Sequence, residues 1–349
     1  MDTITHALSG ALLARAMGCG VRAPGVPTTA QLVAAGTVAA AFPDTDIVTS
    51  MFSSLAYLTA HRGVTHSFLM LPLWAVLLAL LMGVLTRKPL RGFLWVCGAG
   101  LAIHIVGDLI TSFGTMVLAP LSDRRFSIGT TFIIDLILTG IIVLGLLASA
   151  IWRRSRVPAT LGLAVLCGYI GFQGWMRAQA ESSGLEVARA QGWEDAHVVA
   201  LPRPPLPTNW TVVISRGEQY RFAHVNLWRR DMPAANPDDG LIARLHAGFA
   251  PAAAVQWHAA TRYGDDATLQ PLVREAWNAA GLGVYRWFAE LPALHRVEIG
   301  NPSACVWFED LRFLTPGRPT VPFRYGACRE GTGPWQPFRL TPDGPRLLD

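Results

Sequence analysis

Acidic side chains are scarce in the first half of this chain. No glutamate occurs before residue 181, and only six aspartates face twelve lysines and arginines in residues 1–180. The rest of the chain holds 29 − 12 = 17 basic and 24 − 6 = 18 acidic residues, so the overall basic excess belongs to the first half. A near-neutral second half lacks the positive field that nucleic acid requires. We therefore expect no nucleic-acid partner.

Charge as a whole is also low. Charged residues make up 15% of the 349 residues against 51% hydrophobic ones, and the mean hydropathy is +0.33. This composition is typical of a protein with membrane-spanning segments. The first residues, MDTITHALSGALLARA, have no basic side chain before the apolar run, which argues against a signal peptide. Neither internal repeats nor low-complexity tracts are present, so a repeat architecture is excluded.

The five cysteines show no spacing typical of a metal site. Three of them lie in or near apolar segments. Cys305 and Cys328 lie in the second half, where they would form a disulfide if that half is exported. A free pair is the alternative.

Apolar runs predict a helical membrane domain over residues 1–178. Two short stretches rich in Ala and Gly, 5–18 and 29–42, are each shorter than the roughly 20 residues of a full span. They predict a tight helical hairpin whose bend lies near GVRAPGVP. About four full spans follow, and the apolar runs place them at 68–85, 92–110, 132–152 and 157–175.

Basic residues set the expected orientation of these spans. Clusters at 87–91 and 153–156 lie between consecutive spans, which predicts that both loops are cytoplasmic. Residues 1–6, 43–67, 109–131 and everything after 176 then lie on the outer face. We therefore expect a multi-pass protein of the inner (cytoplasmic) membrane whose C-terminal domain is extracytoplasmic.

Residues 179–349 predict a soluble domain of α+β or mainly β structure. Alternating runs such as WTVVIS, YRFAHVNLW and ACVWFEDLRF are typical of strands. Residues 267–281 predict one amphipathic helix. The five histidines of this domain have no ligand spacing, and we interpret them as structural.

Histidine and aspartate side chains gather at the outer face in this topology. All four histidines of the first 110 residues belong to the group, which comprises His6, Asp44, Asp46, His61, His66, His104 and Asp108. Imidazole and carboxylate ligands without thiolate suit zinc, manganese or iron in a hydrolytic site. A bound divalent ion would also offset the charge of acids that lie beside lipid.

The strongest signal is the segment LAIHIVGDLITSFGT. His104 and Asp108 are four residues apart and project from the same face of a helix. An ionisable pair inside an apolar helix is costly, so it indicates a functional site. The alternative is a buried hydrogen-bonded pair without a metal.

The other candidates carry weaker signals. His61 and His66 are five residues apart, roughly 140° around a helix, so they predict a turn at Gly63 with Thr65 capping the next span. Ordinary interfacial histidines are the alternative. Asp44 and Asp46 in PDTD could equally cap a turn, and a lone histidine near a terminus, such as His6, is usually incidental.

Asp135 admits two interpretations. It could orient a ligating histidine from behind, or it could pair with Arg124 or Arg125, which we favour slightly.

Several segments together resemble the YdjM-like family of membrane-bound, metal-dependent hydrolases. They are THALSG, FPDTDI, HRGVTHS, HIVGDLITSFGT and PLSDRRFSIGTTFIID, with a looser likeness in PTNWTVVIS, WFEDLRF and VPFRYG. The resemblance implies a metal role for His6, Asp44, His61, His66, His104 and Asp108. More distantly, the order of these residues is similar to that in zinc-dependent phospholipase C and P1-type nucleases. The later His and Glu ligands of those enzymes have no counterpart here.

These observations predict a polytopic membrane hydrolase with one or two divalent ions, zinc being favoured, at the outer face. Asp46 is the candidate general base, and Arg62 could clamp an anionic oxygen. Thr111, Ser112 and Thr115 could line the site. A phosphoester or other ester of an amphiphilic substrate, such as a phospholipid or a lipid-linked phosphate, is expected. The alternatives are a metal or ion transporter and a non-catalytic membrane scaffold. Below His104 the predicted span offers only apolar residues and Cys97, which disfavours a transporter.

Overall fold

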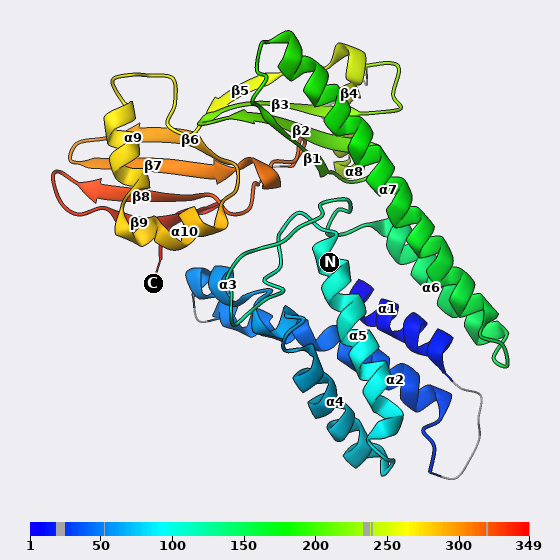
Figure 1. Ribbon diagram of the computed structural model, residues 1–349. Coiled ribbons are helices and arrows are strands. Elements are labelled where there is room, and N and C mark those ends of the chain that lie inside the picture. Colours follow the sequence, from blue (N-terminus) through cyan, green and yellow to red (C-terminus); the bar gives the residue numbers. More distant parts are fainter. Residues whose placement is uncertain (19–24, 52, 233–237, 239, 319, 349) are drawn as a thin grey trace. The chain divides into compact units, whose positions relative to one another are not determined.

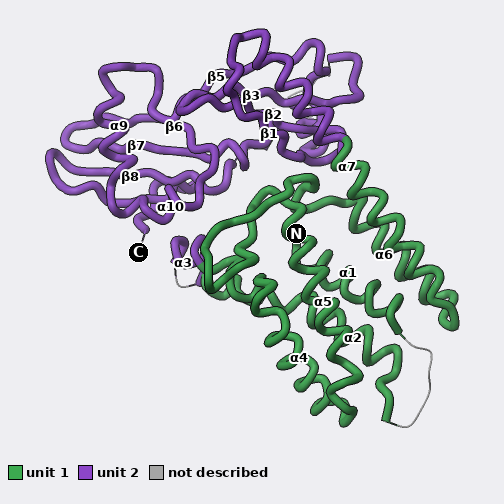
Figure 2. The backbone as a smooth tube through the Cα atoms, viewed as in Figure 1, with its two compact units in different colours: residues 1–49, 60–175 green, residues 50–59, 176–349 purple. Residues whose placement is uncertain are grey.

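The chain folds into two compact units, one helical and one built mainly of strands. The computed structural model describes residues 1–349 apart from 19–24, 52, 233–237, 239, 319 and 349. The first unit comprises residues 1–49 and 60–175, and the second comprises residues 50–59 and 176–349 (Figure 2). Helix α7 (Val157–Ala190) contributes to both units, and the boundary expected at 178/179 falls within it.

The helical unit contains most of the apolar segments expected from the sequence (Figure 1). Its elements are α1 (Thr3–Met17), α2 (Thr29–Ala41), the 3-10 helix η1 (Phe42–Met51), η2 (Val64–His66), α4 (Leu71–Thr86), α5 (Arg91–Leu109), α6 (Leu136–Ile151) and the first part of α7. The expected hairpin of 5–18 and 29–42 corresponds to α1 and α2. Part of its bend, residues 19–24, lies outside the described residues.

Among the residues that the structure describes, three helical segments are long and apolar enough to cross a membrane: Thr29–Met51, Arg91–Leu109 and Val157–Ala190. A fourth span is possible if the bent pair Ser54–His66 and Leu71–Thr86, which meet at 76°, is taken as one. The expected span 132–152 contains α6, which has only 16 residues. It begins late because Asp135 caps its N-terminus and accepts hydrogen bonds from the backbone N–H groups of Ile137 and Leu138.

The expected loop between Asp46 and His61 is instead largely helical. Pro43 has no backbone N–H, so it cannot donate the hydrogen bond that would continue α2 as a regular α-helix. The chain therefore continues past α2 as η1, and α3 (Ser54–Ala60) follows in the second unit. This continuation makes the second helix of the expected short hairpin 23 residues long, which is enough for a span.

Glycines bring α1, α2 and α5 into backbone contact. A Cβ atom added at Gly36 would lie 2.6 Å from Ala14 Cβ and 2.7 Å from the Gly10 carbonyl oxygen. One added at Gly100 would lie 2.9 Å from both Ala39 Cβ and the Gly36 carbonyl oxygen. No side chain fits at these positions, so the three helices approach as closely as their backbones allow. The N-terminal turn of α1 and the C-terminal half of α5 carry the histidines discussed below.

The second unit contains two five-stranded sheets. One has the order β1 (His197–Pro202), β2 (Asn209–Arg216), β3 (Gln219–Asn226) and β4 (Ala250–Pro251), with β5 (His258–Thr261) also paired to β3. The other runs β10 (Gly344–Leu347), β9 (Gln336–Thr341), β8 (Tyr325–Glu330), β7 (Ser303–Asp310), β6 (Pro292–Ile299). Leu201, Val213 and Tyr220 of the first sheet share a core with Ala293 of the second.

The expected strands are present, whereas the expected helix 267–281 is reduced. That region contains α9 (Gln270–Trp277), followed by η4 (Ala280–Leu282) and α10 (Gly283–Phe288), and α8 (Leu241–Ala247) lies earlier in the unit. Cys305 and Cys328 occupy paired positions of β7 and β8 and form a disulfide. Thus the pairing that the sequence left open is present.

We predict that Gly36→Ala destabilises the helical unit. The added methyl group overlaps Ala14 and the Gly10 carbonyl, and such overpacking typically costs about 1–3 kcal/mol. Thermal unfolding of the full chain in detergent, followed by circular dichroism, should show a lower Tm. Gly168→Ala on α7 is the matched control, because no atom lies within 4 Å of its added Cβ. Equal melting temperatures for the two variants would contradict the helix contact.

We also predict that His224 makes the strand unit sensitive to acid. Burial, and next the positive charge of Arg203, lower the pKa of His224 from 6.5 to about 3. Below pH 6.5 His224 therefore becomes protonated in the unfolded chain but stays neutral in the folded chain. The free energy of unfolding falls as the pH drops from 6.5 toward 3. Between pH 7 and pH 5 the loss should be about 2 kcal/mol larger in the wild type than in His224→Gln. Urea unfolding of both proteins at the two pH values measures the difference, and parallel pH profiles would contradict it.

Candidate metal centre

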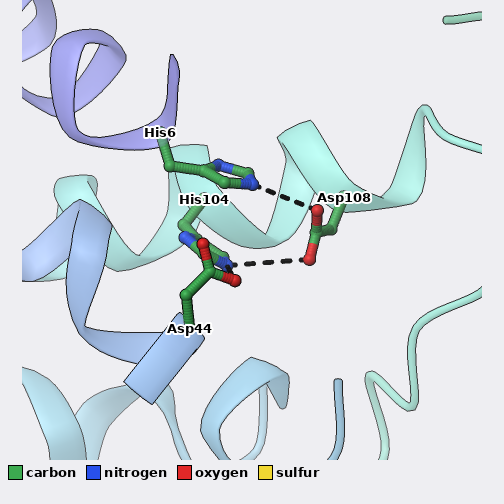
Figure 3. A group of neighbouring side chains, drawn as sticks. All are labelled: His6, Asp44, His104 and Asp108. Carbon is green, nitrogen blue, oxygen red and sulfur yellow. Dashed lines mark hydrogen bonds and ion pairs between the residues drawn. The ribbon is translucent and has the colours of Figure 1, made fainter. Parts of the chain in front are cut away.

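Four side chains from three helical segments form a compact buried group. They are His6 of α1, Asp44 of η1, and His104 and Asp108 of α5. Each offers a ligand atom, and these atoms all lie within 4.8 Å of one another (Figure 3). No second group of this kind occurs among the residues that the structure describes.

Local sequence explains how each segment reaches the group. Asp2 caps α1 by accepting hydrogen bonds from the Thr5 backbone N–H and the Thr5 hydroxyl, which fixes the turn that carries His6. Asp44 lies on the 3-10 helix η1, which continues the chain beyond α2, directly after Pro43. His104 and Asp108 share one face of α5, with His104 Nε2 3.6 Å from Asp108 Oδ2.

His66 reaches the same group from η2. Its Nε2 lies 3.2 Å from Asp108 Oδ2 and 3.7 Å from Asp44 Oδ1. The His66 and His104 rings are 4.7 Å apart, and the His6 and His104 rings stack at 3.7 Å. Three imidazoles and two carboxylates therefore converge, and all five residues are buried.

Hydrogen bonds on the outer side of two rings determine which nitrogen faces inward. His104 Nδ1 donates to the Ala40 carbonyl oxygen at 2.5 Å, because a carbonyl can only accept. His66 Nδ1 lies 3.3 Å from Asp46 Oδ2 and 2.9 Å from the Thr65 hydroxyl. In His104 Nε2 therefore keeps its lone pair toward the group, and His66 has a carboxylate behind Nδ1, an arrangement typical of metal-ligating histidines.

Several buried ligand atoms of the group lack hydrogen-bond partners within the described structure. They are Asp44 Oδ2, His66 Nε2, His104 Nε2 and Asp108 Oδ2. The inward-facing nitrogen of His6 is Nε2, which lies 3.1 Å from Asp108 Oδ1. A buried polar atom without a partner is costly and infrequent in native proteins. Four such atoms in one group, all of them nitrogen or oxygen ligand types, fit a divalent cation such as zinc, manganese or iron. This group could hold a metal ion.

Asp46 lies behind the histidines rather than in the four-residue group. Its Oδ1 accepts a hydrogen bond from His61 Nδ1 at 2.7 Å. Its Oδ2 accepts from the Arg62 backbone N–H and the Thr65 hydroxyl, each at 3.0 Å. The carboxylate thus orients His61 and His66 and fixes the turn that joins them. Thr65 takes part in this network and does not cap the next helix, which begins at Leu71.

His61 lies beside the group and not within it. The His61 ring is 5.9 Å from the His66 ring and packs at 5.5 Å against Phe113. Of the six residues expected as metal ligands, the structure therefore brings five together and places His61 on Asp46. The role of Asp46 as a general base stays a prediction.

Arg62 lies against the group as expected for a cation near the ligands. Its Nη2 is 2.9 Å from Asp108 Oδ1, and its Nη1 donates to the Thr111 hydroxyl at 2.8 Å. The side chain is only 1% exposed. Its backbone has a φ of 62°, held by its N–H bond to Asp46 and by the Met116 N–H bond to its carbonyl. The amino group of Met1 also contacts Asp108 Oδ1.

Asp135 does not pair with Arg124 or Arg125. It caps α6 and accepts hydrogen bonds from the Tyr169 hydroxyl at 2.9 Å and from Gln173 Nε2 at 2.7 Å. An aspartate directly before an apolar run is itself a helix-start signal, and that signal gives its position correctly. The favoured interpretation from sequence was wrong because the capping bonds and the two α7 side chains already occupy its oxygens.

Comparison with known proteins places residues 1–180 within one family. The profile of the YdjM inner membrane protein family matches this range. A curated relative, "Uncharacterized protein YfhP" of Bacillus subtilis (strain 168), is 28% identical over 178 residues. That match covers 49% of this chain and 52% of the relative, so it spans about half the relative's length. No solved structure matches. The YdjM resemblance is thereby confirmed, and the more distant likeness to phospholipase C and P1-type nucleases is not shown.

We predict that Asp46→Asn weakens metal binding without removing a ligand of the group. The substitution replaces the carboxylate behind His66, and loss of such a partner typically lowers metal affinity about 10–100-fold. Competition with a chromogenic chelator measures the affinity of the full chain in detergent. His61→Ala is the comparison variant, because His61 contacts Asp46 but lies outside the group. An unchanged affinity in Asp46→Asn would contradict the orienting role.

Proposed function

The chain belongs to the YdjM inner membrane protein family, and we propose that it is a membrane-embedded, metal-dependent hydrolase. The observation that carries the proposal is the set of four buried ligand atoms without hydrogen-bond partners in the described structure. Such a set is stabilised by a cation and is costly without one. Zinc is the favoured ion, because three imidazoles and two carboxylates without a thiolate are typical of hydrolytic zinc sites.

His6, Asp44, His66, His104 and Asp108 would hold one or more divalent ions. An ion bound there supplies Lewis acidity, which polarises a scissile bond and activates water near neutral pH. Thr111 supports the candidate clamp Arg62 by accepting a hydrogen bond from its Nη1.

Asp46 is the candidate general base, and its bond to His61 supports this role. His61 Nδ1 lies 2.7 Å from Asp46 Oδ1, so the pair can share one proton. A proton taken from water could then pass between imidazole and carboxylate without leaving the site. The orienting role of Asp46 toward His66 is compatible with this, because it uses the other oxygen.

The expected substrate is a phosphoester or other ester of an amphiphilic molecule, with membrane lipid as the partner. Exposed apolar side chains next to the group support this expectation. Ile47 and Val48 follow Asp46 directly on η1 and are 57% and 50% exposed. An acyl chain would find apolar surface beside the polar centre.

The outer face is the proposed location of the site and of the C-terminal domain. The disulfide between Cys305 and Cys328 supports this, because disulfides form and persist outside the reducing cytoplasm. A transporter is less well supported, since the buried α5 residues before His104, from Phe93 to Leu101, are apolar apart from glycine and Cys97.

We predict that the purified full chain contains a transition metal and cleaves a lipid phosphodiester in a chelator-sensitive way. The double variant His66→Ala, His104→Ala should lose bound metal and at least about 100-fold in activity, because two ligands are removed. Mass spectrometry of metal content and a screen of lipid phosphodiesters, with zinc and with chelator, measure both.

His197→Ala is the control, because that exposed histidine lies on β1 in the other unit. Wild-type protein that binds no transition metal would overturn the proposal. Full phenotypic rescue by the double variant would support a scaffold instead.

A further inference from the structure

Two arginines share one aromatic ring beside the metal centre. The Arg62 guanidinium carbon lies 4.9 Å from the centroid of the Phe113 ring, and that of Arg125 lies 5.3 Å from it. Arg125 also donates to the Gly114 carbonyl at 3.1 Å and to the His61 carbonyl at 3.2 Å. These bonds position the guanidinium of Arg125 beside the ring.

The loaded centre has a surplus of positive charge. Counting side chains alone, Asp44, Asp46 and Asp108 contribute three negative charges. Arg62 and Arg125 contribute two positive charges. One divalent ion held by neutral imidazoles changes the sum from −1 to +1. Because the group is buried, where charge is poorly screened, such a surplus attracts an anion.

Arg62 has capacity for a further acceptor. Its carboxylate partner Asp108 lies in the group that would share its charge with the ion. Its buried Nε has no hydrogen-bond partner within the described part of the chain. A guanidinium presents its N–H groups in a planar fork, which matches phosphate oxygens better than it matches a neutral carbonyl.

Both arginines are held before any ligand arrives. The backbone of Arg62 is fixed on both sides, as described above. Phe126, which follows Arg125, exchanges two backbone hydrogen bonds with Thr115 at 2.9 Å and 3.0 Å. Side chains fixed in this way lose little conformational entropy when they bind.

We propose that Arg62 and Arg125, both packed on Phe113, form a subsite for the anionic oxygens of a phosphate ester beside the metal centre. The inference rests on the proposed function and sharpens it, because it selects a phosphate substrate over a neutral ester. It also gives Arg125, which the sequence offered only as a partner for Asp135, a role in binding.

Binding of inorganic phosphate to the zinc-loaded full chain in detergent, measured by calorimetry, tests the subsite. Arg125→Gln should weaken phosphate binding about tenfold or more, because one charge-assisted contact is lost, while metal content stays unchanged. Arg125→Lys should recover part of the loss. Arg124→Gln is the matched control, since that neighbouring side chain is exposed and lies over Phe126 instead, and it should bind phosphate as the wild type does.

A second arm uses a short-chain phosphatidylglycerol below its micellar concentration. If this lipid binds more tightly than inorganic phosphate, the subsite is assigned to a lipid headgroup. If inorganic phosphate binds more tightly, the subsite is assigned to a free phosphate. Either result supports the inference, provided that Arg125→Gln weakens the binding of the preferred ligand.

Equal binding by wild type and Arg125→Gln would overturn the subsite. Metal-loaded wild type that binds neither probe would overturn it too, while leaving the metal centre intact. Failure to load any metal is a different result, since it removes the proposed function itself.

Discussion

The helical unit depends on the need to compensate one buried carboxylate. Asp108 is fully inaccessible to solvent on an apolar helix, and an uncompensated charge there would cost several kcal/mol. Three neighbouring segments supply groups toward it: α1 brings His6, the turn after α3 brings Arg62 and His66, and α5 itself brings His104. The same contacts to Asp108 therefore determine both how these elements pack and which groups form the centre.

The sequence predicted which residues belong to this group better than it predicted the position of each residue within it. The four-residue spacing of His104 and Asp108 depends only on helix geometry, so it could be recognised without tertiary information. Asp44 and Asp46 are two residues apart in one loop, and no local pattern distinguishes the one that faces the group from the one behind it. Their roles follow from where η1 meets the turn at Gly63, which is a long-range contact. His61 was grouped with the ligands for the same reason.

The boundaries of the helices and strands show the same contrast between local and long-range information. The strands of the second unit follow from alternation along the chain, and β2, β3 and β7 lie where the pattern indicates. Helix 267–281 was overestimated at both ends, because α9 begins at Gln270 and ends at Trp277, and the 3-10 helix η4 follows from Ala280. The start of α6 was missed because an aspartate that caps a helix and an aspartate that orients a ligand look alike in a sequence.

The glycine contacts among α1, α2 and α5 also set the geometry of the centre. Helices α1 and α5 both pack on α2 at Gly36, where no side chain fits, so the separation of the three helices is fixed by contact distances between backbones. His6 and His104 are carried by α1 and α5. The distance between two of the candidate ligands therefore depends on a glycine of the third helix, α2, which carries neither of them.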